Sequence, residues 1–167
     1  MPLFVTTHQI ILLAYAGILA AAGWSDLNRY IIPNRVSIAL LLLYPAHVMT
    51  AGVPVEVWGG VAVAFAAFAV CAGLFTCGLM GGGDVKLFAV LALWAGPAAI
   101  APFMLVTAVL GGVLAMVMLS PLGVLLPHPP LSLFKAGLRP GRARQSMPYG
   151  VAIAGAGLLL AVELAGR

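Results

Sequence analysis

Long, almost uncharged hydrophobic segments constrain the fold of this chain more than any other feature. Of its 167 residues, 63% are hydrophobic and 7% are charged. Soluble domains carry about 25% charged residues, and so short a chain has too little interior to keep this much apolar surface from water. The apolar runs also lack the alternation of membrane-barrel strands. The sequence therefore predicts an all-α integral membrane protein, because helices satisfy their own backbone groups in lipid.

The apolar runs are long enough for several membrane crossings, since a spanning helix needs about 17–25 residues. We expect a single transmembrane domain over residues 1–167, with a long loop at about 121–147. The six expected spans are at about 8–24, 36–52, 56–78, 85–97, 99–120 and 148–165. The fourth run is short and is expected to begin inside the protein. Residues 1–7 contain no Lys or Arg, which favours a retained first span over a cleaved signal peptide.

Basic residues are concentrated in alternate connections between these runs. Seven of the eight lie there or at the borders: Arg29, Arg35, Lys86, Lys135, Arg139, Arg142 and Arg144. The opposite connections, near 52–55 and 97–98, contain none, and Arg167 is the exception. The positive-inside rule then predicts an N-terminus outside and basic loops in the cytoplasm. The net charge of +4 is explained by this orientation and by contact with anionic lipid, and we expect no nucleic-acid partner.

Two of the four acidic residues, Asp26 and Asp84, lie at the edges of apolar runs. Carboxylates at this depth are costly, so they indicate function. Asp26 is expected to follow one span and Asp84 to follow three, which puts both on the cytoplasmic side. Two carboxylates that face one water can share a proton and divide the roles of general base and general acid. The pair is therefore a candidate catalytic site.

The residues around Asp84 allow two interpretations. Gly81, Gly82 and Gly83 could admit an extended peptide and accept unusual backbone angles, which makes them candidate substrate-binding residues. Alternatively, they form a flexible turn in which Asp84 caps the next helix. Spacing alone favours the turn. Lys86 is either a charge that sets orientation, a lysine that reaches the interface, or a substrate contact; the first two are favoured.

Other catalytic motifs are missing from the sequence. The glycine run lacks the Gly-Lys-Ser/Thr ending of a phosphate-binding loop, and there is neither an HExxH nor a GxSxG motif. Cys71 and Cys77 are six positions apart and are interpreted as packing residues rather than a redox or zinc pair. We expect no metal and no cofactor, because two distant aspartates without His or Cys partners make a poor closed metal site.

Three segments together resemble a known family. They are Asp26 with Ile32-Pro33-Asn34, the run Gly81-Gly82-Gly83-Asp84-Val85-Lys86-Leu87, and the late run Pro148-Tyr149-Gly150-Val151-Ala152-Ile153-Ala154. They look like those of the type IV prepilin peptidases, which are intramembrane aspartyl proteases with a GxGD motif. The resemblance extends over nearly the whole chain. It implies a GxGD-type polytopic fold in the bacterial inner membrane, with Asp26 and Asp84 as the catalytic pair and Gly81 and Gly83 in the GxGD element.

The resemblance also implies a substrate. It would be a prepilin, inserted as a single transmembrane helix, whose short basic leader is removed after a glycine at the cytoplasmic face. Larger members of the family carry a cytoplasmic four-cysteine zinc insert and methylate the new N-terminus. This chain has no such cysteines, so it resembles the compact tight-adherence (Flp-type) peptidases, and we do not expect it to act as an N-methyltransferase.

Two other functions stay open at this stage. A small transporter or proton pathway would also use intramembrane aspartates, although the paired halves typical of transporters are not evident. An inactive relative could serve as a scaffold for pilus assembly, although no catalytic residue is missing. The particular prepilin and the oligomeric state are not determined by these motifs.

Overall fold

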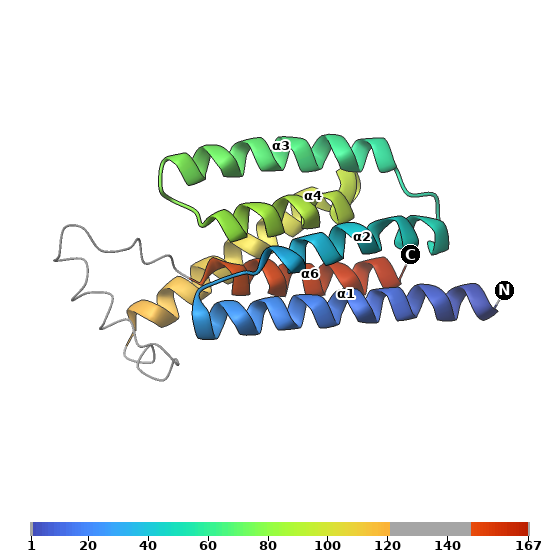
Figure 1. Cartoon of the computed structure of the whole chain (residues 1–167), viewed down its shortest axis with the longest axis horizontal. Coiled ribbons are helices and arrows are strands. Elements are labelled where there is room, and N and C mark those ends of the chain that lie inside the picture. The colour runs from blue at the N-terminus through green and yellow to red at the C-terminus, as the bar shows by residue number, and fades with distance from the viewer. Residues whose placement is uncertain (1, 121–147, 167) are drawn as a thin grey trace.

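The computed structural model describes residues 2–120 and 148–166 of the chain. Within these residues every regular element is an α-helix (Figure 1). The helices are α1 (Pro2–Arg29), α2 (Asn34–Thr50), α3 (Val57–Thr76), α4 (Gly82–Leu119) and α6 (Tyr149–Ala165). The all-α prediction is therefore confirmed, whereas the loop predicted at 121–147 lies outside the described residues.

Helix α4 is a hairpin rather than one straight rod. Gly96 has φ 60° and ψ −174°, a backbone conformation that glycine adopts readily. The rings of Phe88 and Phe103 are 5.2 Å apart, centre to centre, whereas in a straight helix these residues would be separated by about 22 Å. Figure 1 shows the second part of α4 running back past the first. The reversal at Gly96 lies at the end of the predicted run 85–97, next to the break expected before the run 99–120.

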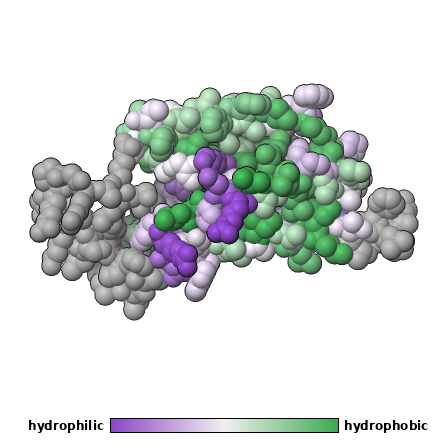
Figure 2. Space-filling view, in the orientation of Figure 1, coloured by the Kyte–Doolittle hydropathy of each residue, from purple (hydrophilic) through white to green (hydrophobic). Residues whose placement is uncertain are grey.

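The outer surface is suited to lipid. Three of the described helices are long and apolar enough to cross a membrane, namely Thr7–Arg29, Val57–Thr76 and Gly82–Met118, and Tyr149–Ala165 is a shorter apolar helix. Large hydrophobic side chains point outward. The face in Figure 2 is hydrophobic over much of its area, with a hydrophilic patch left of its centre. The chain is thus a helical membrane protein. The number of six crossings and the outside N-terminus stay predictions.

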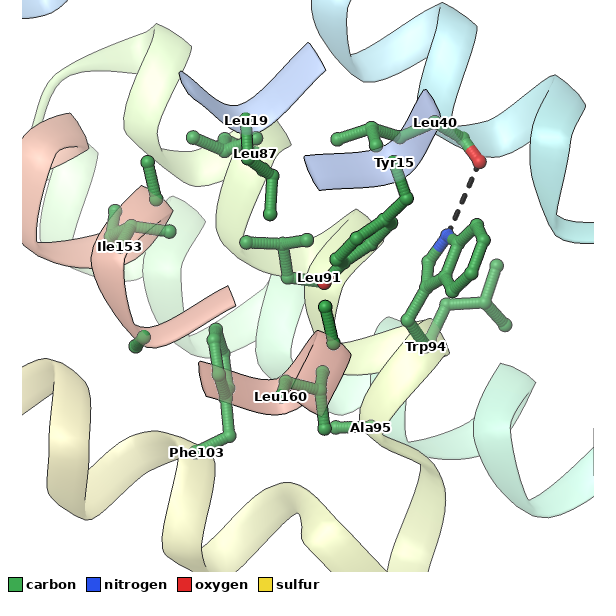
Figure 3. Close-up of a cluster of buried hydrophobic side chains, with 14 of the residues drawn as sticks. Tyr15, Leu19, Leu40, Leu87, Leu91, Trp94, Ala95, Phe103, Ile153 and Leu160 are labelled. Atoms are coloured by element: carbon green, nitrogen blue, oxygen red, sulfur yellow. Dashed lines mark hydrogen bonds between the residues drawn. The ribbon is translucent and has the colours of Figure 1, made fainter. Parts of the chain in front are cut away.

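Close packing fixes α6 between α1 and α4, as Figure 1 shows. A side chain at Gly157 would place its Cβ 2.7 Å from Leu19 Cδ1 and 3.0 Å from Leu91 Cδ1, so this glycine allows the three helices to approach. Trp94 Nε1 donates a hydrogen bond of 3.2 Å to the Leu40 carbonyl oxygen, which connects α4 to α2 in the core (Figure 3). The helices that carry the two aspartates are therefore held in a well-packed framework.

The end of the first helix differs from the prediction. The first span was expected to end near residue 24, with Asp26 after it, but α1 continues to Arg29 and Asp26 lies in its last turn. The helix stops at Tyr30, which has φ 53° and donates its backbone N–H to the Asp26 carbonyl oxygen at 2.9 Å. This left-handed cap satisfies a carbonyl at the helix end. It explains why the helix ends at Arg29.

Candidate active site

Three helix ends meet at one end of the bundle. Asp26 lies in the last turn of α1 and Asp84 in the first turn of α4, and α6 begins beside them at Tyr149. In Figure 1 these three ends lie on the same side of the molecule. Asp26 is 4% exposed and Asp84 is 6% exposed, and the charge of Asp26 acts on the Asp84 carboxyl. The structure therefore brings the two predicted aspartates together in a buried site.

The start of α6 holds the Asp26 carboxylate. The backbone N–H of Val151 donates a hydrogen bond of 3.2 Å to Asp26 Oδ2, and the Gly150 N–H donates to the same carboxylate. A Cβ at Gly150 would lie 2.8 Å from Asp26 Oδ2, so only glycine lets the helix approach this closely. Free N–H groups at a helix N-terminus stabilise an anion. Asp26 is thus bound by a part of the chain 125 residues away, a contact that no local pattern predicts.

The start of α4 holds Asp84 in a similar way. Gly81 is the N-cap of the helix, and its backbone N–H donates a hydrogen bond to the Asp84 carboxyl. A Cβ at Gly81 would lie 2.8 Å from Asp84 Oδ2, and real Cβ atoms do not come so close. Gly81 is therefore needed for this reason, and not because of an unusual backbone angle, since its φ is −78°.

The glycine run is helical rather than an open turn. Gly82 and Gly83 belong to the first turn of α4, so of the three glycines that could form a flexible turn only Gly81 precedes the helix, as its N-cap. A Cβ at Gly83 would lie 3.1 Å from Ile32 Cβ, whereas one at Gly82 would make only ordinary contact, 3.4 Å from the Phe75 ring. Neighbouring atoms leave no room for a side chain at Gly81 and little at Gly83, whereas Gly82 has more space. Packing therefore explains why glycine is needed at the first and third positions of the run.

Ile32 lies between Gly83 at the start of α4 and Gly150 at the start of α6. Its buried side chain contacts Gly83, one residue before Asp84, and also packs against Gly150, which holds Asp26. A single isoleucine thereby sets how closely α4 and α6 approach at this end of the bundle. Ile32 belongs to the motif Ile32-Pro33-Asn34, but its packing role could not be predicted from the sequence, because it depends on contacts from two distant helices.

Tyr30 is a third polar group near the pair. Burial, followed by the negative charge of Asp26, raises the pKa of Tyr30. This tyrosine has φ 53°, a left-handed conformation that is uncommon for residues with a side chain. Strained backbone of this kind often occurs at functional sites. Sequence reasoning missed Tyr30 because no feature of the sequence distinguishes it from an ordinary interfacial tyrosine.

Lys86 lies on the outer side of the site. Its Nζ donates a hydrogen bond of 2.9 Å to Asn34 Oδ1, and both side chains are exposed. The bond joins the start of α4 to the first residue of α2. This gives Lys86 a structural partner, while its contact with a substrate stays a prediction.

The described residues contain no cluster of metal-binding side chains. In residues 2–120 and 148–166, no three His, Cys, Asp or Glu side chains lie close enough to hold a metal ion. Cys71 and Cys77 are free thiols, the first buried and the second exposed. Burial in α3 supports the packing role predicted for Cys71, whereas Cys77 is exposed at the end of that helix and does not fit the same prediction.

One comparison with known proteins gave a match. A family model described as the type IV leader peptidase family matches residues 13–116. The matched part includes Asp26, Ile32 and the segment from Gly81 to Asp84, and it stops before α6. Neither the curated proteins nor the solved structures include a match to the chain.

Proposed function

The chain belongs to the type IV leader peptidase family, and from this premise we propose that it is an intramembrane aspartyl endopeptidase. Its proposed substrate is a type IV prepilin of the Flp type, from which it removes the short basic leader after a glycine. The observation that carries the proposal is the meeting of two buried carboxylates, Asp26 and Asp84, from the ends of separate helices. Buried carboxylates that share a site are the arrangement that acid–base hydrolysis needs.

The contacts of the two carboxylates suggest different roles. Asp26 accepts two N–H groups from the start of α6, whereas Asp84 accepts one, from Gly81 at the start of α4. Each helix start favours a negative charge, and the additional donor stabilises that charge better on Asp26. Asp26 is therefore the ionised base, and Asp84 is the proton donor. A water molecule between them attacks the carbonyl carbon of the scissile peptide, its proton passes to Asp26, and Asp84 gives its proton to the carbonyl oxygen.

The second half of the reaction restores both groups. Asp26 passes the proton it has taken to the leaving nitrogen as the C–N bond breaks. One hydroxyl of the tetrahedral intermediate returns its proton to Asp84, and the new carboxyl group forms. Positioned acid–base groups of this kind contribute roughly 10²–10⁴-fold each to the rate.

The proposal includes an orientation. Six crossings, with α4 counted as two because of the reversal at Gly96, and an outside N-terminus would put both aspartates at the cytoplasmic face of the bacterial inner membrane. The basic residues Arg29, Arg35 and Lys86 lie at this end, in agreement with the positive-inside rule. Anionic lipid is the proposed partner of these charges.

The proposal is tested by cleavage of a co-expressed Flp-type prepilin. Asp26→Asn and Asp84→Asn should each abolish the processed band while the variants still accumulate in the membrane. Glu56→Gln is the control, because Glu56 is exposed and precedes α3 at the other end of the bundle; it should process the substrate normally. Full cleavage by either Asp variant would exclude an aspartyl mechanism, and a folded wild-type protein without activity would favour the scaffold hypothesis.

A further inference from the structure

A large apolar groove lies between α3 and the second part of α4. It has a volume of about 730 Å³. On the α3 side it is lined by small and branched residues such as Val63, Ala66 and Val70, and on the α4 side by Ile100 and Met104. The groove is a feature of the surface that the proposed chemistry at the aspartates does not require.

The chemistry of the groove limits what can occupy it. Thr107 is one of the few polar residues in the lining, and its hydroxyl already donates to the Phe103 carbonyl oxygen at 2.8 Å. The groove therefore presents apolar carbon to its occupant, and an apolar segment in the membrane is the matching partner. From Val63 to Leu74 the lining follows α3 for about 16 Å, which corresponds to about three turns of a helix.

One end of the groove lies beside Gly81 and Gly150, the residues whose N–H groups bind the two aspartates. Met80 and Tyr149 line it there. Met80 is followed by Gly81, which binds the Asp84 carboxyl, and Tyr149 is followed by Gly150, which binds Asp26. A segment lying in the groove would therefore emerge between the groups that hold the two aspartates. An acyl chain or a second copy of the protein gains nothing from this continuity, whereas a peptide to be cleaved requires it.

The position of α3 allows entry from the membrane. This helix packs chiefly against α4 and forms the outer layer of the bundle in Figure 1. Few of its residues are buried. A partner can therefore approach the groove sideways from the lipid without disturbing the core formed by α1, α4 and α6.

From these observations we infer that the groove between α3 and α4 binds the apolar transmembrane helix of the substrate and delivers the peptide bond before it to Asp26 and Asp84. The inference rests on the proposed peptidase function and identifies where the substrate binds. Side chains on the groove should then affect cleavage of a substrate that has its helix, and should have no effect on a short peptide that lacks it.

Two alanines of α3 provide a matched test. Ala66 and Ala69 are both exposed, but only Ala66 is part of the groove lining. Ala66→Trp should lower kcat/KM for a full-length prepilin by about tenfold or more, whereas Ala69→Trp should behave like the wild type. Both variants should cleave a soluble peptide, made of only the leader and the residues around the cleavage site, at the wild-type rate. Equal cleavage of the full-length prepilin by the two variants would overturn the inference.

A second measurement uses a cysteine placed in the groove. Ala66 is exposed and part of the lining, so Ala66→Cys in a chain with Cys71→Ser and Cys77→Ser provides one accessible thiol there. With Asp84→Asn added to prevent turnover, a prepilin with one cysteine in its apolar helix should form a disulfide with this thiol upon oxidation. A bond between two copies at position 66, or none with any position of the substrate helix, would overturn the inference. The peptidase proposal itself would fail only if the Asp variants kept their activity.

Discussion

Replacing Gly150 with alanine should impair cleavage without unfolding the protein. The added Cβ would lie 2.8 Å from Asp26 Oδ2 and 2.9 Å from Asp26 Cγ, and it would also meet Ile32 Cδ1. Real Cβ atoms do not approach so closely, so the carboxylate must move away from the start of α6. The Val151 hydrogen bond, at 3.2 Å, is already long, and a shift of this kind breaks it.

The size of the effect follows from the bond that is lost. Hydrogen bonds to charged groups contribute about 1.5–3 kcal/mol, so the cleavage rate should fall by about 10- to 100-fold. The rate is measured with purified protein and a full-length prepilin in detergent, with thermal unfolding as the check on folding. Gly155→Ala is the control, since its Cβ would meet only the flexible end of Leu110, at 3.1 Å. If Gly150→Ala cleaved within about twofold of Gly155→Ala, binding of Asp26 by α6 would be unimportant for the reaction.

Three further predictions concern the neighbours of the pair. Gly83→Ala should reduce both stability and cleavage, because its Cβ would press on Ile32 at 3.1 Å, whereas Gly82→Ala should be close to neutral; equal loss by both would contradict the packing explanation of the motif. Tyr30→Gly should raise the unfolding temperature, because it relieves a left-handed conformation that costs about 1–2 kcal/mol, yet it should slow cleavage; unchanged cleavage would remove Tyr30 from the site. Lys86→Gln should keep a donor for Asn34 and retain near-normal cleavage, whereas a large rise in KM would identify Lys86 as a substrate contact.

The helical fold could be predicted because its causes are local. The uncharged runs require lipid, and in lipid segments without the alternation of barrel strands form helices. The short break near Gly96 and Pro97 is also visible in the sequence. Asp26 and Asp84 were noticeable because carboxylates are rare in apolar surroundings. Such local signals indicate which residues are unusual and on which side of the membrane they belong.

The contacts that organise the site could not be predicted in this way. The bond from Val151 to Asp26 and the position of Ile32 against Gly83 and Gly150 depend on how distant helices pack. The extension of α1 through Asp26 depends on a cap at Tyr30, a position where glycine is the usual choice. Hydrophobic periodicity and helix propensity contain no information about these contacts between distant helices.

The most direct test of the central claim is whether the two catalytic positions face each other in the native membrane. Asp26→Cys and Asp84→Cys are combined in a chain with Cys71→Ser and Cys77→Ser, and a short bifunctional thiol reagent is added. The account predicts an internal cross-link, detected as a shift on a gel, and predicts none for a control that pairs Asp26→Cys with Glu56→Cys. If both thiols of the first pair react with the reagent but remain unlinked, the two carboxylates do not share a site and the account is wrong.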